Sequence, residues 1–167
     1  RLVGSEMCIR DRAYFMEAKS YFMLSPLYTL DQDDTITAID KLQFFINRFP
    51  NSEYVSEAIE LMSQLQNKIE RKDFEISKQY YTIRDYNSAI KSFDNFIADN
   101  PGTIFREEAL YFKWLSQYEI AVNSVEARIN ERVTELERSL DNFLRYYPNT
   151  IFIEDLSKKM NIAKQIL

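Results

Sequence analysis

The chain has 167 residues, a net charge of −5 at pH 7, 46% hydrophobic residues and 28% charged residues, a composition typical of globular rather than disordered proteins. Histidine is absent, cysteine occurs once, and Gly4 and Gly102 are the only glycines. These absences exclude a histidine-based catalytic centre, a cysteine-built zinc site, a disulfide framework and a glycine-rich phosphate loop. The acidic balance argues against a nucleic-acid surface, which needs a basic patch. We therefore expect no enzyme activity, no metal, no cofactor and no nucleic-acid partner.

The first twelve residues differ from the rest of the chain. Residues 1–12 show neither helical nor strand periodicity, and they contain the single cysteine, Cys8. We interpret this segment as non-native, translated from sequencing-adapter DNA, with a genuine N-terminal extension as the alternative. Cys8 has no lipobox-like context and is not expected to carry a lipid. Residues 13–167 then form the repeat array, which we interpret as the C-terminal part of a longer protein.

Few glycines and prolines predict long helices in the remainder. Residues 25–34 contain Pro26 and an acidic run and form the clearest loop. Apolar residues at three- and four-residue spacing then predict helix over about 53–83, either one uninterrupted helix or two joined without a breaker. The predicted buried stripe consists of Val55, Ile59, Met62, Leu65, Ile69, Ile76, Tyr80 and Ile83. Further helices are predicted over about 105–122, 129–147 and 153–167, the first of them apolar on more than one side.

A repeated pattern surrounds three prolines. Pro50, Pro101 and Pro148 are each followed by Asn or Gly, then by Ser or Thr, and then by an aromatic residue four positions after the proline. Proline disfavours helix in the residue before it, and the small residue suits a turn. The pattern predicts a helix–turn–helix joint at each proline. The hydroxyl residues expected to cap the following helices are Ser52, Thr103 and Thr150.

The residues upstream of each proline also align, at the same spacings of 4, 7 and 12 residues. The three copies are Ala38, Leu42, Phe45 and Pro50; Ala89, Phe93, Phe96 and Pro101; and Leu136, Leu140, Phe143 and Pro148. This register is typical of tetratricopeptide repeats, and the prolines lie 51 and 47 residues apart instead of the usual ~34. We predict an all-α, tetratricopeptide-like (TPR) helical solenoid of about seven antiparallel helices. Ala38, Ala89 and Phe93 are its repeat-defining structural positions, and Ala89 is expected at a close helix–helix contact.

The aromatic content of 12 Phe, 11 Tyr and 1 Trp has two interpretations. Roughly four fifths of these side chains are expected in the core, because they fall on helical stripes. Examples are Phe44, Phe45, Phe93, Phe96, Phe143 and Tyr147. Those expected at the surface are Tyr81, Tyr86, Tyr111, Tyr118 and Tyr146. Aromatic residues and arginine dominate binding hot spots, so the candidate partner-binding residues are Tyr81, Arg84, Tyr86 and Tyr118. Tyr81 and Arg84 are expected to point partly away from the buried stripe; the alternative is that Tyr81 packs on the next helix and Arg84 is solvated.

Several motifs carry a resemblance to a known family. They are residues 28–35 (Tyr-x-Leu-Asp-Gln-Asp-x-Thr), 45–52 (Phe-Ile-Asn-Arg-Phe-Pro-Asn-Ser) and 106–111 (Arg-Glu-Glu-Ala-Leu-Tyr), together with the Tyr80-Tyr81 and Asp85-Tyr86 pairs. From Ala13 to Ala163 the chain resembles the C-terminal part of the BamD family of outer membrane assembly lipoproteins, in the form typical of Bacteroidetes.

The resemblance implies a non-enzymatic scaffold of the outer-membrane β-barrel assembly machinery, at the periplasmic face of the outer membrane of a Gram-negative bacterium. Its implied partners are a BamA-type barrel-inserting subunit, other proteins of the assembly complex, and unfolded segments of outer membrane proteins. The implied lipid anchor and first repeats are expected to lie outside this sequence. Because the family binds unfolded substrates largely through those repeats, this part is expected to dock to assembly partners.

The competing interpretation is a general TPR peptide-binding adaptor of the cell envelope, of the Tol–Pal coordinator type. A lipobox cysteine at the N-terminus of the complete protein would favour the first interpretation, and a coiled-coil segment the second.

Overall fold

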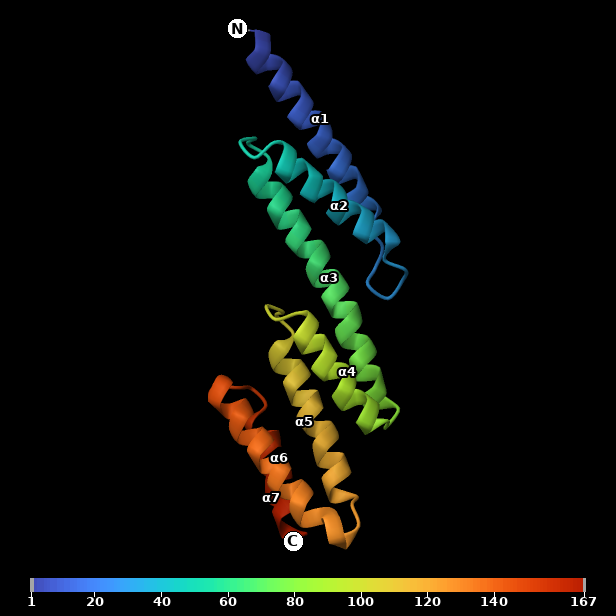
Figure 1. Cartoon of the computed structure of the whole chain (residues 1–167), viewed down its shortest axis with the longest axis vertical. Coiled ribbons are helices and arrows are strands. Elements are labelled where there is room, and N and C mark those ends of the chain that lie inside the picture. Colours follow the sequence, from blue (N-terminus) through green and yellow to red (C-terminus); the bar gives the residue numbers. More distant parts are fainter. Residues whose placement is uncertain (1, 167) are drawn as a thin grey trace. The chain divides into compact units, whose positions relative to one another are not determined.

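The computed structural model describes the backbone of residues 2–166 and the side chains of residues 9–166. Within this range the chain forms seven helices and no strand (Figure 1). They are α1 (Leu2–Leu24), α2 (Asp33–Arg48), α3 (Val55–Thr82), α4 (Tyr86–Asp99), α5 (Arg106–Val122), α6 (Glu126–Tyr146) and α7 (Ile153–Gln165). The all-α prediction is confirmed. None of these helices, over the described residues, has the length and apolar character needed to cross a bilayer.

Helix α1 begins at Leu2, so helical structure extends through residues 2–12, in the segment that shows no periodicity in the sequence. The interpretation of this segment as non-native stays a prediction.

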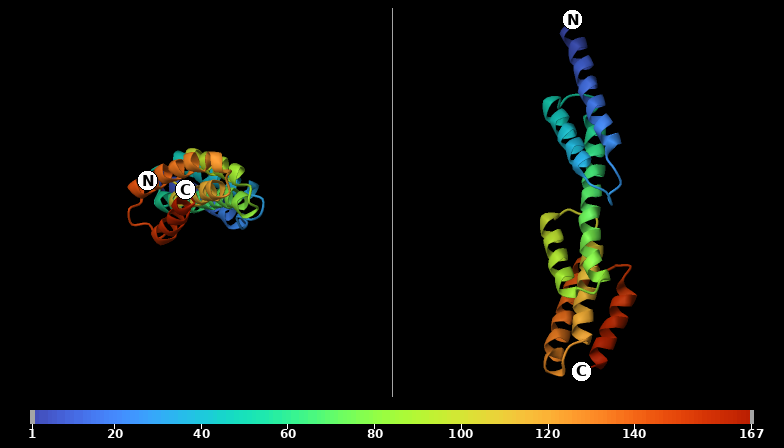
Figure 2. Two further views of the ribbon diagram at one scale, coloured as in Figure 1. Left: turned by 90° about the horizontal axis from the view of Figure 1, so that it is seen from below. Right: turned by 90° about the vertical axis from the view of Figure 1, so that its right-hand side faces the viewer.

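The chain divides into two compact units, and the boundary falls within α3. Unit 1 (Arg1–Lys72) contains α1, α2 and the first part of α3, whereas unit 2 (Asp73–Leu167) contains the last part of α3 and α4 to α7. Consecutive helices within each unit run antiparallel, as Figures 1 and 2 show. The predicted tetratricopeptide-like arrangement of helix pairs is therefore confirmed within the units.

The core of unit 1 consists of alanine, leucine and phenylalanine side chains from its three helices. Its fully buried members are Phe15, Ala18, Ala38, Leu42, Phe45, Ala58 and Leu65. The ring of Phe15 stacks on that of Tyr54 at 4.9 Å and meets that of Phe45 at 5.4 Å. Phe44 is 52% exposed, so its expected place in the core is wrong. Phe44 precedes the buried Phe45 by one residue, and this rotation of about 100° around the axis of α2 carries it off the buried face.

Unit 2 has two core clusters that share α5. The first joins α3, α4 and α5, and its buried members are Phe74, Ala89, Phe93, Phe96 and Ala109. The second joins α5, α6 and α7 around Trp114, whose indole N–H donates to the carbonyl oxygen of Leu136 at 3.1 Å. Because α5 is packed by α4, α6 and α7, it is buried on several sides, as its apolar pattern predicted. Ala89 is fully buried within the first of these clusters.

Helix α3 is uninterrupted, which decides between the two alternatives for residues 53–83. The predicted stripe is only partly buried. In unit 2, Phe74, Ser77 and Tyr81 face α4 and α5, and the Ser77 hydroxyl bonds that of Ser92 at 2.8 Å. By contrast Tyr80 is 37% exposed. The expectation that Tyr80 is buried while Tyr81 points away is wrong, because α4 and α5 pack on the face of α3 that carries Phe74, Ser77 and Tyr81. Ile59, Ile76 and Ile83 are also exposed.

The three proline joints share one geometry. Pro50, Pro101 and Pro148 are exposed in turns, and a hydroxyl two residues later accepts a hydrogen bond from the backbone N–H two residues further on. The corresponding distances are 3.4 Å for Ser52, 3.2 Å for Thr103 and 3.2 Å for Thr150. These hydroxyls therefore stabilise the turn before each helix. The expectation that they are the N-caps of the helices is wrong.

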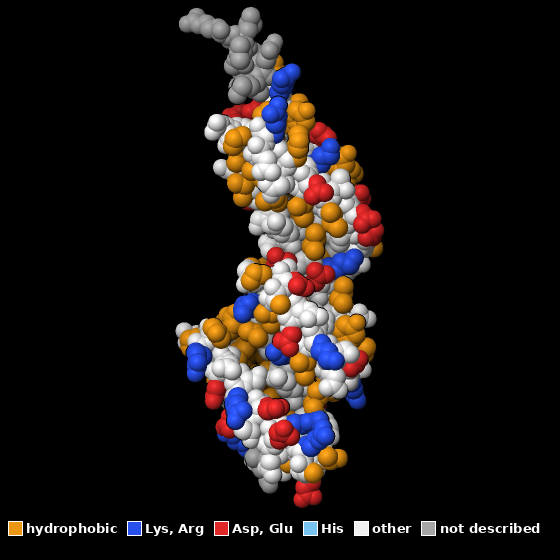
Figure 3. Space-filling model, viewed as in Figure 1, with side chains coloured by type: hydrophobic (Ala, Val, Ile, Leu, Met, Phe, Trp, Pro, Cys, Tyr) orange, Lys and Arg blue, Asp and Glu red, His pale blue; other side chains and the backbone are white. Residues whose placement is uncertain are grey.

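Charges of both signs are interspersed on the face shown in Figure 3, without a large basic patch.

Candidate functional site

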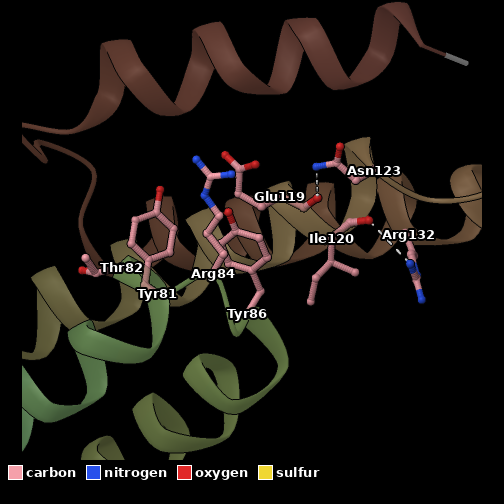
Figure 4. A pocket seen from close by; sticks show the side chains of 8 residues that line it. All are labelled: Tyr81, Thr82, Arg84, Tyr86, Glu119, Ile120, Asn123 and Arg132. Atoms are coloured by element: carbon pink, nitrogen blue, oxygen red, sulfur yellow. Dashed lines mark hydrogen bonds between the residues drawn. The ribbon is translucent and has the colours of Figure 1, made fainter.

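A cleft of about 930 Å³ in unit 2 brings together three of the four candidate binding residues, Tyr81, Arg84 and Tyr86 (Figure 4). They come from the end of α3, the α3–α4 turn and the start of α4. The other lining residues come from the end of α3, the end of α5, and α6; they are Thr82, Glu119, Ile120, Asn123 and Arg132. The cleft therefore lies where the C-terminal ends of α3 and α5 meet the N-terminal parts of α4 and α6.

Backbone hydrogen bonds fix the turn that carries Arg84. The N–H of Asp85 donates to the carbonyl oxygen of Tyr80 at 3.0 Å, and the N–H of Arg84 donates to that of Tyr81 at 3.0 Å. This pair of bonds defines a Schellman motif, in which Arg84 occupies the left-handed position after the helix end. Its φ of 64° is the only positive φ of a non-glycine residue in the described chain. Helix α4 follows at once, with the Asp85 carboxylate accepting from the N–H of Ser88 at 3.2 Å.

The backbone conformation of Arg84 costs stability. Glycine normally occupies this position because it has no Cβ, and the left-handed conformation costs other L-residues roughly 1–2 kcal/mol. A positive charge just past the C-terminus of α3 recovers only about 0.3–1 kcal/mol through the helix dipole. The dipole does not fully offset the strain, so arginine is a less stable choice here than glycine by about 1 kcal/mol.

The side chain of Arg84 is exposed and projects over the cleft. Figure 4 shows it passing the ring of Tyr86 toward the carboxylate of Glu119. Within the described part of the chain, its guanidinium forms no ion pair or side-chain hydrogen bond. Its donors are therefore available to a ligand.

Two tyrosine rings form the wall beside this guanidinium. The rings of Tyr81 and Tyr86 lie 5.8 Å apart, and Tyr81 meets Phe112 edge-on at 5.4 Å. Tyr81 is half-buried and packs against both core clusters of unit 2, so it is a structural residue as well as a lining residue. Burial, followed by the negative charge of Glu119, raises the pKa of Tyr81. Its hydroxyl therefore remains a neutral hydrogen-bond donor at physiological pH.

The remaining walls of the cleft are held by hydrogen bonds at the end of α5. Arg132 donates to the hydroxyl of Ser124 at 2.5 Å and to the carbonyl oxygen of Ile120 at 3.5 Å. Asn123 donates to the carbonyl oxygen of Glu119 at 2.8 Å. Arg132 donates only to neutral oxygens, so its positive charge is not neutralised by a partner. The lining residues together carry two guanidinium groups and one carboxylate. The cleft consequently carries a net positive charge within an acidic chain.

Tyr118 is not part of this surface, which corrects its expected exposure. It is 8% exposed, stacks on Trp114 with ring centroids 6.0 Å apart, and has the ammonium of Lys159 5.0 Å above its ring. Residue 118 faces α7 because α7 packs directly on α5. Tyr111 is also drawn into this contact: it stacks on Phe152 at 4.0 Å and donates to Asp155 at 2.9 Å. Tyr146 is exposed, as expected, but lies outside the cleft.

Three lining residues were not predicted from the sequence: Glu119, Asn123 and Arg132. A signal was available, because stacked repeats place the C-terminal ends of successive first helices side by side. Applied to α3 and α5, this rule places the end of α5 beside the turn that carries Arg84.

Comparison with known proteins assigns the family. A family model described as outer membrane lipoprotein (YfiO) matches residues 9–82 and again residues 77–167. The chain belongs to this family. The assignment confirms the resemblance that the sequence motifs indicated.

One curated relative has a more specific name of its own. The outer membrane protein assembly factor BamD of Rickettsia prowazekii is 28% identical to this outer membrane lipoprotein family member over 99 residues. The alignment covers 59% of this chain and 39% of the relative, so the chain spans about two fifths of the length of the protein it matches.

Proposed function

We propose that this chain is a non-enzymatic scaffold in outer membrane protein assembly, and that it docks a BamA-type barrel-inserting subunit at the periplasmic face of the outer membrane. Membership of the outer membrane lipoprotein family carries the proposal, since the family model matches both the first and the second half of the chain. The similarity to an outer membrane protein assembly factor supports the same role. Pairs of antiparallel helices stacked in tetratricopeptide fashion are suited to presenting binding surfaces to other proteins.

The cleft around Arg84 is the docking surface we propose. It combines a guanidinium that has no partner in the described chain with the rings of Tyr81 and Tyr86. Arginine and tyrosine are the residue types that contribute most to binding hot spots. The neighbouring joints and helix ends are fixed by backbone hydrogen bonds, so the surface is preorganised for a partner.

The test is a pull-down of the purified barrel-inserting subunit from the same organism by this chain. Tyr81 packs into the core, so its replacement by alanine would mix a loss of stability with a loss of binding. The cleaner variants are Tyr81→Phe, which keeps the ring, and Arg84→Glu, which reverses the free charge. We expect Arg84→Glu to abolish capture and Tyr81→Phe to weaken it.

The matched control is Arg138→Glu, which makes the same charge change on the exposed face of α6, outside the cleft. It should capture the subunit as well as the unchanged chain does. Circular dichroism of each variant checks that its helices are kept. Full capture by Arg84→Glu would move the docking surface elsewhere, and capture by none of the chains would contradict the proposed partner.

A further inference from the structure

Resting on the proposed function, we propose a ligand class for the cleft: a carboxylate on an extended polypeptide segment, held by the guanidinium of Arg84 beside the rings of Tyr81 and Tyr86. The observation behind this inference is the juxtaposition of a strained backbone and an unpaired side chain at one residue. Arg84 has a φ of 64° at a position where glycine is more stable.

The strain points to a role for the side chain. Residues held in sparsely populated backbone regions cluster at binding sites, where a particular side chain is needed in one place. The backbone bonds of the Schellman motif need no side chain at all, since glycine forms them equally well. The guanidinium also makes no ion pair in the described chain that would account for it. A structural role therefore does not explain arginine at residue 84.

The charge balance of the cleft selects an anion. Arg84 and Arg132 outnumber Glu119, and Arg132 is occupied by neutral oxygens. A planar guanidinium matches the two oxygens of a carboxylate, which accept parallel hydrogen bonds from it.

The surroundings of the guanidinium favour a carboxylate carried by polypeptide. Two tyrosine rings lie beside Arg84, and their apolar faces and hydroxyl groups suit the backbone and side chains of an extended segment. Asn123 adds a side-chain amide at the rim. Inorganic phosphate would use the charge but not these rings.

The experiment measures binding of short synthetic peptides to the whole purified chain by ¹⁵N NMR of the Arg84 Nε–H group and by calorimetry. The probe is an acetylated and amidated peptide with one central glutamate flanked by tyrosine and serine. Its glutamine analogue removes the charge, and the same analogue with a free C-terminus moves the carboxylate to the chain end. The glutamate peptide should shift the Arg84 signal and bind at least about tenfold more tightly than the amidated glutamine analogue.

The third peptide distinguishes the two sources of a carboxylate. Tight binding of the free C-terminus identifies a terminal carboxylate as a ligand, and weak binding restricts the site to acidic side chains. Either result supports the inference if the amidated glutamine analogue binds weakly. Equal binding of all three peptides would overturn the inference. Displacement of all three peptides by inorganic phosphate to an equal extent would also overturn it.

Three variants test the site, and the two at residue 84 separate the effect of the arginine side chain from that of its backbone conformation. Arg84→Gly and Arg84→Asn both suit the left-handed conformation and lack the guanidinium, so both should fold and lose the preference for glutamate over glutamine. Arg84→Gly should also raise the melting temperature by about 2–4 °C. Glu119→Gln removes the competing negative charge and should tighten binding of the glutamate peptide. Preserved preference in Arg84→Gly, or weaker binding by Glu119→Gln, would contradict a carboxylate ligand.

Arg138→Ala removes an equal charge from α6 outside the cleft and should leave all of these values unchanged. The peptide experiment and the pull-down can fail separately. If Arg84→Gly loses the peptide but still captures the barrel-inserting subunit, the carboxylate site stands and docking of that subunit through the cleft is wrong. If it keeps the peptide, the carboxylate site is wrong whatever the pull-down shows.

Discussion

Helices α2 of unit 1 and α4 of unit 2 carry the equivalent buried alanines Ala38 and Ala89, yet the chain enters the two helices by different means. A loop of residues 25–32 leads into α2, whereas residues 83–85 suffice before α4. The loop in unit 1 is organised by side chains, and the turn in unit 2 is organised by backbone hydrogen bonds.

The loop of unit 1 depends on Gln32, which is 6% exposed. Its Nε2 group donates to three carbonyl oxygens of the loop at 2.9, 3.0 and 3.2 Å, and its Oε1 accepts from the hydroxyl of Thr35 at 2.8 Å. Thr35 lies 2.7 Å from the hydroxyl of Ser25, which accepts from the ammonium of Lys68 at 2.7 Å. Every side chain in this hydrogen-bond network is therefore occupied by a structural contact.

The turn of unit 2 makes no such demand on side chains. Its two Schellman bonds use only backbone groups, and the side chain of Arg84 remains unpaired within the described residues. A helix–helix connection held by the backbone therefore leaves its side chains available for recognition. In this chain the cost is the left-handed conformation of one arginine.

The largest effect is expected from Gln32→Leu, which removes the centre of the unit 1 network. Three carbonyl groups of the partly buried loop and the buried Thr35 hydroxyl lose their partner, so the free energy of unfolding should fall by about 3 kcal/mol. Urea unfolding followed by circular dichroism measures the change. Gln43→Leu, on the exposed face of α2, is the control and should stay within about 0.5 kcal/mol. Similar values for both variants would show that the network does not hold the loop.

A second test replaces the equivalent alanines. Ala38→Leu and Ala89→Leu each insert a larger side chain at a fully buried contact, and each should reduce the free energy of unfolding by about 1–3 kcal/mol. Equal losses of stability in the two variants would mean that the units differ in the connections between their helices and not in the packing of these alanines. Ala98→Leu lies on the exposed side of α4 and serves as the control. An unchanged melting temperature in Ala89→Leu would mean that the repeat register is misplaced.

The proline joints allow a smaller comparison. Thr103, at the joint into α5, is 7% exposed, and its hydroxyl accepts from the N–H of Phe105 at 3.2 Å. Ser52, at the joint into α3, is half-buried and makes the longer bond of 3.4 Å. Thr103→Ala should therefore reduce the free energy of unfolding by about 1 kcal/mol, and Ser52→Ala by less. The reverse order in urea unfolding would contradict the dependence on burial.

The smallest expected effect is a pH dependence confined to the entry of α4. Hydrogen bonds from the side chain and backbone of Ser88 lower the pKa of the Asp85 carboxyl below its ordinary value of 3.8. Because the folded state holds the proton less tightly, the stabilisation is present above that value and is lost as the pH falls through the lowered pKa. Asp85→Asn should flatten the fall in stability below about pH 4. Gln32, at the entry of α2, does not titrate, so Gln32→Leu should leave this pH dependence unchanged.

Helix positions and joints were predictable because they depend on local chemistry. The three proline joints and the buried alanines follow from turn residues and helical spacing, and they appear in the structure. The loop predicted at residues 25–34 also appears, but it ends at residue 32 because α2 begins at Asp33. The buried face of α3 in unit 2 was not predictable in this way. Ile76 and Tyr80 continue the apolar spacing, but packing of α4 and α5 selects the face of Phe74 and Tyr81.

The site was predictable only in part. The sequence placed Tyr81, Arg84 and Tyr86 within a few residues, whereas Glu119, Asn123 and Arg132 reach the cleft through tertiary packing of α5 and α6. Tyr118 was misplaced for the same reason, because only the position of α7 determines that it is covered. The left-handed conformation of Arg84 also had no visible signal, since arginine rarely adopts it.

The strained arginine has a consequence for laboratory evolution. Every arginine codon becomes a glycine codon by one base change, so the more stable Arg84→Gly variant is within immediate reach of random mutation. Selection for heat resistance alone should recover it early. Selection for partner capture should remove it from the same library, so the two enrichment profiles would diverge most sharply at this one codon.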